Sequence, residues 1–159
     1  MFREMRRKKQ ILTPEKSIEI LKKGTSGVLA LSGDDGYPYA VPLSYVYENS
    51  MLYFHGAKEG HKIDATRTCD KASFCVVEQD HIVPPKYTTY YRSAIAFGRI
   101  RILEDEKEVR RAAWLLAVRY YPEDTESGRQ EEINKYWKSL CMMEFSIEHL
   151  TGKESIELR

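Results

Sequence analysis

Several features that would place a chain in a special class are missing here. No run of residues is apolar for long enough to cross a membrane, and no apolar segment follows the basic residues at the start, so we expect neither a membrane span nor a signal peptide. Glycine (9) and proline (6) are sparse, which excludes collagen-like and low-complexity chains. The three cysteines, Cys69, Cys75 and Cys141, form an odd set without C-x-x-C spacing, which predicts reduced thiols and a cytoplasmic location.

An excess of charge of either sign is also missing. Lysine and arginine number 25 against 24 aspartate and glutamate residues, so neither nucleic acid nor an anionic membrane is favoured as a partner. Residues 1–10 are an exception, with five basic residues and one acidic residue. We interpret them as a solvated basic arm, and binding of nucleic acid by this arm is the less favoured alternative.

The familiar motifs of hydrolysis, metal binding and nucleotide binding are absent. The four histidines form no H-x-x-x-H or H-E-x-x-H pair, so no metal site is expected. There is no G-x-S-x-G nucleophile turn and no G-x-x-x-x-G-K-[ST] phosphate loop.

The hydrophobic pattern predicts one domain over residues 1–159 that is mainly β, with six antiparallel strands in a closed or nearly closed barrel and about four flanking helices. Asp35-Gly36 predicts a tight hairpin, and residues 37–47 alternate between bulky and small side chains. Pro84-Pro85 predicts an irregular loop over 80–87, and the strand after it is expected to bury Ile95 and Phe97. Strands are expected near 28–31, 37–47, 51–55, 72–79, 92–103 and 141–148, with helices near 14–23, 60–68, 104–120 and 133–140.

Three segments are candidates for chemistry. In residues 53–64 a strand ends, glycines open the backbone and a helix begins beside Lys58, His61 and Lys62, which outlines an anion site. A plain strand-to-helix connection with solvated lysines explains the spacing equally well. Residues 40–44 form a strand with one small side along which a flat ring could lie, and residues 87–93 are rich in hydroxyls and aromatic rings that suit ring stacking or a subunit contact. Ordinary barrel packing explains both of these segments as well.

Two strings taken together carry a family resemblance. They are Pro38-Tyr39-Ala40-Val41-Pro42-Leu43 and Tyr53-Phe54-His55-Gly56-Ala57-Lys58-Glu59-Gly60-His61-Lys62, with Phe97-Gly98 in a later strand. The chain resembles the pyridoxamine 5′-phosphate oxidase-like flavoproteins, and within them the Nim-type (5-nitroimidazole resistance) group, from about Arg6 to Lys153. The resemblance implies a split β-barrel homodimer that binds FMN at the subunit interface.

The resemblance also implies a role for each candidate segment. The flavin ring would lie beside Val41, Pro42, Leu43 and Ser44, with Tyr53, Phe54 and His55 on the neighbouring strand. Ala57, Lys58, His61 and Lys62 would hold the phosphate, and Tyr90, Tyr91, Arg92 and Trp137 would approach the ring from either chain. His55 is the candidate for the residue at the reacting face, although a strand-end histidine bonded to loop backbone explains it equally well.

The chain departs from the oxidase at two places. Where the oxidase carries Ser-Arg-Lys, this chain has Ala57-Lys58-Glu59, and residues 146–159 hold no clear counterpart of the oxidase's arginine segment. These differences favour an FMN-dependent oxidoreductase of the Nim type, in which NADH or NADPH reduces the flavin and a small acceptor, with nitro compounds as candidates, reoxidises it. The alternative is a non-catalytic barrel that binds haem, a deazaflavin or another small ligand.

Overall fold

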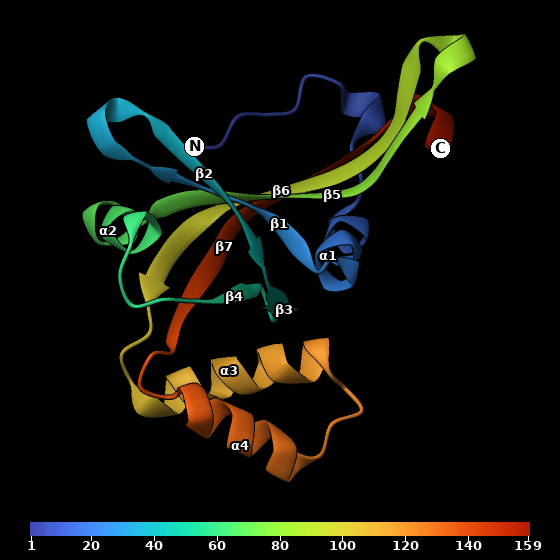
Figure 1. Ribbon diagram of the computed structural model, residues 1–159. Coiled ribbons are helices and arrows are strands. Elements are labelled where there is room, and N and C mark those ends of the chain that lie inside the picture. Colours follow the sequence, from blue (N-terminus) through green and yellow to red (C-terminus); the bar gives the residue numbers. More distant parts are fainter.

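The computed structural model describes all 159 residues, and its centre is one antiparallel sheet of seven strands. The sheet has the order β2-β1-β5-β6-β7-β4-β3 and curls into a split barrel (Figure 1). The mainly β fold is therefore confirmed, with seven strands where six are expected. The strands are β1 (Ser26–Ser32), β2 (Pro38–Ser44), β3 (Val46–Glu48), β4 (Met51–Gly56), β5 (Lys71–Val83), β6 (Thr88–Ile102) and β7 (Cys141–Glu154).

The additional strand arises because the segment 37–47 is divided. β2 and β3 are the two edges of the sheet, although only Tyr45 separates them in the chain. β2 pairs with β1 and β3 pairs with β4, so one continuous segment bridges the opening between the two edges. Tyr45 is fully buried at this crossing, where its ring meets Phe74 edge-on at a centroid distance of 5.0 Å.

The hairpin between β5 and β6 is longer than the proline pair predicts. Pro84 and Pro85 occupy only a short 3-10 turn (Pro84–Lys86), and Tyr87 leaves that turn with a φ of 48°. Residues 80–83 pair in register with 88–91, so they are strand and not loop. The predicted loop over 80–87 is thus wrong in extent, because the prolines are confined to the turn and leave the ladder intact. The outer part of this hairpin projects beyond the rest of the sheet (Figure 1).

The helices begin where the sequence provides capping residues. α1 (Pro14–Lys23) is capped by the Thr13 side chain, α3 (Glu106–Tyr120) by Asp105 and α4 (Glu126–Tyr136) by Thr125, each of which accepts a hydrogen bond from a backbone N–H in the first turn. α2 (His61–Thr68) has no side-chain cap. Short 3-10 turns cover Lys8–Gln10, Asp34–Gly36 and Ile156–Leu158. No helix combines the length and the apolar character that a membrane crossing requires.

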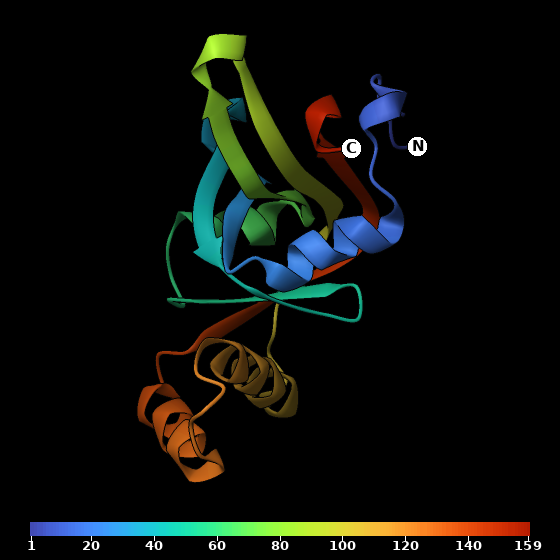
Figure 2. The same cartoon turned by 90° about the vertical axis from the view of Figure 1, so that its right-hand side faces the viewer.

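Two apolar clusters hold the domain together. The larger one fills the barrel with inward-facing residues such as Phe54, Phe74 and Phe145. The smaller one lies between α3, α4 and the outer face of β3, β4 and β7, where Tyr53 and Met142 are buried. Figures 1 and 2 show α3 and α4 as a separate layer below the barrel. This layer covers one outer face of the sheet and leaves the opposite outer face without a covering helix.

Candidate functional site

The end of β4 presents one of the predicted ring-side residues to a surface. Side chains alternate along this strand, so Phe54 is fully buried inside the barrel and Tyr53 is buried under α3. The Tyr53 hydroxyl accepts a 3.4 Å hydrogen bond from the Arg111 guanidinium. His55 lies on the same outer face as Tyr53 but is exposed. Of the three predicted residues on β4, only His55 is therefore available to a ligand within one chain.

Beyond β4, the backbone opens before α2. Gly60 at the start of the helix has a φ of 129°, a conformation that favours glycine, and its carbonyl oxygen accepts 3.1 Å hydrogen bonds from the Ile63 and Asp64 amides. Because no side chain caps the helix, the N–H groups of its first residues have no side-chain partner. The segment therefore has the backbone form of an anion site.

Three cations gather around the Cys141 thiol below this helix. Burial raises the pKa of Cys141, while the nearby charges of Lys62, Lys58 and Arg67 lower it. The Lys62 side chain lies against Gly56, where a Cβ atom would be 2.8 Å from the ammonium nitrogen. None of the three cations forms an ion pair with a carboxylate of the chain. An anion could therefore approach them without displacing an existing partner.

Arg67 is absent from the sequence prediction. It lies in the last turn of α2 and lines a cavity of about 460 Å³ together with Lys58, Cys141 and Trp137. Residue spacing could not predict that Arg67 belongs to the site. Arg67 and Lys58 line the same cavity only because β7 begins beside them at Cys141. Trp137 belongs to this neighbourhood too, and its ring lies 4.1 Å from the Arg110 guanidinium carbon.

His61 lies apart from this group of cations. Its ring stacks on Tyr39 with centroids 3.9 Å apart, and its Nε2 atom lies 3.8 Å from the Asp34 carboxylate. These contacts join α2 to the β1–β2 hairpin. To bind the phosphate as predicted, the His61 imidazole would have to contact it while keeping its contacts with Tyr39 and Asp34.

The small side of β2 faces outward, and the bulky side faces the barrel. Val41 and Leu43 pack against the barrel core, whereas Pro42 and Ser44 are exposed. Pro42 lies beside Val28, and Val28, Cys75 and Ile95 continue the row across β1, β5 and β6. A second row consists of Ala40, Ala30, Ser73 and Phe97. We call these eight residues the uncovered face.

The expected burial of two residues on the uncovered face, Ile95 and Phe97, is wrong. Ile95 and Phe97 are 39% and 37% exposed, although the pattern predicts that they are buried. They point away from the barrel, and Ala94 and Ala96 fill the inward positions. The N-terminal arm covers one end of the face, where the Phe2 ring lies 5.6 Å from Phe97 and stacks on His149.

Tyr90, Tyr91 and Arg92 lie on the β5–β6 hairpin and already have partners within the chain. The Tyr90 hydroxyl accepts a 2.9 Å hydrogen bond from Lys86, and the Tyr91 hydroxyl donates a 3.3 Å bond to Gln10. Arg92 pairs with Glu78 at 3.1 Å and with Glu154 at 3.0 Å. The hairpin points away from α2 (Figure 1), so one chain alone does not bring these residues to the cations.

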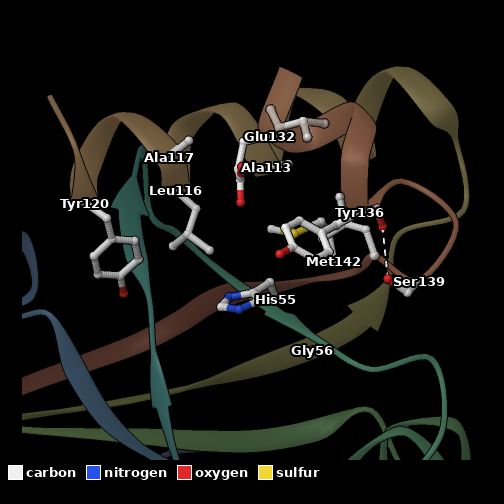
Figure 3. Close-up of a pocket in the computed structure, with 12 residues that line it drawn as sticks. His55, Gly56, Ala113, Leu116, Ala117, Tyr120, Glu132, Tyr136, Ser139 and Met142 are labelled. Carbon is white, nitrogen blue, oxygen red and sulfur yellow. Dashed lines mark hydrogen bonds between the residues drawn. The ribbon is translucent and has the colours of Figure 1, made fainter. Parts of the chain in front are cut away.

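His55 also faces a cavity of about 430 Å³ between the sheet and the α3–α4 layer (Figure 3). The size lies within the roughly 300–1,000 Å³ of small-molecule sites. Most of its lining is apolar and includes Leu116, Ile133 and Met142. The site region thus contains a cationic end below α2 and an apolar end beside His55.

Comparison with known proteins identifies the fold and the family. None of the curated proteins matches this chain. A candidate 5-nitroimidazole antibiotic resistance protein from Bacteroides thetaiotaomicron superposes with a TM-score of 0.77 at 20% identity, over 91% of this chain and 86% of the other. An FAD-binding protein from Mesorhizobium loti gives 0.68 at 25% identity, over 92% and 97%. The FAD and haem binding protein from Mycobacterium smegmatis gives 0.73 at 22% identity, over 93% and 74%.

The family model is more decisive, because it spans nearly the whole domain. The model described as pyridoxamine 5′-phosphate oxidase matches residues 13–154, from the cap of α1 to the end of β7. It includes the cations below α2, His55 and both rows of the uncovered face. This chain is a member of the pyridoxamine 5′-phosphate oxidase family.

Proposed function

We propose that the protein is an FMN-dependent oxidoreductase that works as a homodimer. The observation that carries the proposal is the group of three unpaired cations near Cys141: Lys58 and Lys62 at the glycine-flanked start of α2, and Arg67 in its last turn. Family membership and structural neighbours that bind FAD support a flavin as the ligand.

The cationic end fits a phosphate monoester. Lys58 and Lys62 provide ammonium donors, Arg67 provides a guanidinium, and the uncapped helix provides backbone N–H groups. Gly56 leaves room for the Lys62 side chain that a larger residue would take. The same segment carries two negative charges, Glu59 in the exposed loop and Asp64 in the first turn of α2, and the three cations outnumber them.

The ring of the flavin would lie along the outward side of β2. Pro42 and Ser44 are exposed and small, so a flat ring can come close to the backbone of 41–44. It could accept hydrogen bonds from the N–H groups of this stretch other than at Pro42, which has no N–H. His55 would lie at the edge of the ring, with its imidazole free to hold or pass a proton. Tyr53 and Phe54 would support β4 from within the domain instead of contacting the ring with their side chains.

The uncovered face is the surface that a second copy would cover. Its two rows are apolar or small, and Val77 beside them is 61% exposed. Contiguous apolar surface of this kind is typical of protein interfaces. We propose that a partner seated on this face brings its own Tyr90, Tyr91 and Arg92 to the other chain's site, so that residues far apart in one chain serve one flavin.

A bound flavin supplies two-electron chemistry that no side chain of the protein can perform. The protein's contribution is to hold the phosphate, place the ring and exclude water from one side of it. NADH or NADPH would donate two electrons, and a small acceptor would take them. For a nitro acceptor, two electrons and two protons give the nitroso compound and water.

The experiment follows the reduction of the flavin in the purified protein. Protein loaded with FMN is mixed without oxygen with NADH or NADPH, and the loss of flavin absorbance is recorded before a nitroaromatic acceptor is added. Bleaching by a donor and its reversal by the acceptor support the proposal. Bound FMN that neither donor reduces would contradict the oxidoreductase function.

A haem-binding module is the second candidate, and the cavity beside His55 favours it. The exposed imidazole of His55 next to an apolar cavity would supply a nitrogen ligand for a haem iron, and the Mycobacterium smegmatis neighbour binds haem as well as FAD. Titration with haemin separates the two functions. A sharp Soret band that disappears in His55→Ala would favour the haem module.

A further inference from the structure

The cavity beside His55 has a charge pattern that restricts what it can bind. It lies between the sheet (His55, Gly56 and Met142) and the α3–α4 layer, which contributes Leu116, Ile133 and Tyr136 among others. Glu132 on α4 is the only carboxylate in the lining, and no lysine or arginine is part of it. Figure 3 shows the Glu132 carboxylate directed into the cavity and His55 facing it from β4.

The other polar groups of the cavity are already paired or neutral. The Tyr120 hydroxyl donates to the backbone oxygen of Thr25 at 3.2 Å, and the Ser139 hydroxyl donates to that of Tyr136 at 3.1 Å. Glu132 itself forms no ion pair within 4 Å, and Lys135, the nearby cation of the same helix, lies 5.0 Å from the centre of the Tyr136 ring. Lys62 lies on the other face of β4 from His55, against Gly56. The carboxylate of Glu132, an exposed residue, is therefore the only formal charge among the lining residues. Lys135, outside the lining, lies near enough to interact with it electrostatically.

We infer that this cavity is the acceptor pocket and that it selects compact aromatic ligands carrying a positive charge or N–H donors, through Glu132. Apolar walls favour the ring, and an unpaired carboxylate favours a cation or donor and opposes an anion. The assignment as acceptor pocket rests on the proposed flavin function, in which His55, a residue of the cavity lining, would lie at the edge of the ring. The charge preference of the cavity follows from its lining residues alone and does not depend on a flavin. Phosphate esters and carboxylates are accordingly poor ligands for it.

Three ligands of nearly the same shape test the charge preference: benzamidine, benzamide and benzoate. Their binding is measured by calorimetry on the full chain, once without flavin and once loaded with FMN. We expect benzamidine to bind most tightly and benzoate most weakly, with at least about a tenfold difference between them. Equal affinities, or a preference for benzoate, would overturn the inference.

Matched variants assign the preference to Glu132. Glu132→Gln should reduce the ratio of benzamidine to benzoate affinity by about tenfold. Glu131→Gln makes the same charge change at the adjacent exposed position outside the cavity, and it should leave the ratio unchanged. An equal loss in both variants would show that the net charge of α4 sets the preference and not Glu132, which contradicts the assignment.

A cavity-filling variant locates the binding. Ala117→Phe places a ring in the cavity from α3 and should abolish binding of all three ligands, with circular dichroism confirming the fold. Val118→Phe, exposed on the same helix and outside the lining, is the control. Benzamidine that still binds to a folded Ala117→Phe protein would place the site elsewhere. Because the flavin-free titration is independent of the flavin, a protein that binds no FMN would contradict only the proposed function.

Discussion

The Tyr45 hydroxyl donates a 2.6 Å hydrogen bond to the backbone oxygen of Leu21 near the end of α1. Tyr45 is the single residue between β2 and β3, and both it and Leu21 are fully buried. The bond therefore fixes the point at which the chain crosses from one edge of the sheet to the other. It also positions β2, along whose outward side the flavin would lie.

Removing this hydroxyl should destabilise the fold. Tyr45→Phe leaves the buried Leu21 oxygen without its partner, and we expect the free energy of unfolding to fall by about 1–3 kcal/mol. Urea denaturation followed by circular dichroism measures the change. Tyr37→Phe, which removes a hydroxyl from a side chain that is 75% exposed, is the control and should alter stability little.

The same residue predicts a loss of stability at alkaline pH. Burial raises the pKa of Tyr45 above its ordinary value of 10.0. Above that value the unfolded chain loses the Tyr45 proton while the folded chain keeps it, so unfolding becomes more favourable as the pH rises. We expect the unfolding free energy of the wild type to fall more steeply than that of Tyr45→Phe between about pH 9 and pH 11. Parallel pH dependences in the two proteins would show that Tyr45 titrates normally.

The proposed phosphate site predicts a difference between the binding of FMN and that of riboflavin. Lys58→Ala, Lys62→Ala and Arg67→Ala should each weaken FMN binding about tenfold, because each removes a charge-assisted contact. Riboflavin lacks the phosphate, so its affinity should stay the same. Lys107→Ala, an exposed lysine on α3, is the control for net charge. Equal losses for FMN and riboflavin would mean that these residues support the fold and not the phosphate.

The uncovered face predicts that dimerisation and flavin binding fail together. Ile95→Glu places a charge in the middle of this face, and light scattering should show a monomer that binds FMN weakly. Val118→Glu is a matched control, because Val118 on α3 is 37% exposed against 39% for Ile95. A dimer that persists in Ile95→Glu would rule out this face as the subunit contact.

Much of the fold could be predicted from local chemistry. Thr13-Pro14 marks the start of α1, and Asp35-Gly36 forms the turn between β1 and β2 with positive φ at both residues. The division of 37–47 could not be predicted, since alternation continues through Tyr45 and only tertiary packing sends the two halves to opposite edges. The burial expected for Ile95 fails within one chain for a related reason: the alternation identifies an apolar face but not the molecule that covers it.

The candidate site, like the fold, could be predicted only in part from the sequence. The segment 53–64 is marked by its glycines and cations, and the structure brings Lys58 and Lys62 together near Cys141. Arg67 and Glu132 carry no local signal, because their positions depend on how α2 meets β7 and how α4 meets β4. Contacts between elements distant in sequence are fixed by the assembled barrel and not by residue spacing.

The identity of the bound chromophore tests the central claim most directly. The protein is purified without added cofactor, its visible spectrum is recorded, and any chromophore released on denaturation is identified by mass spectrometry. We expect a yellow protein that releases FMN at about one molecule per chain. A colourless protein that does not bind FMN on titration would contradict the account.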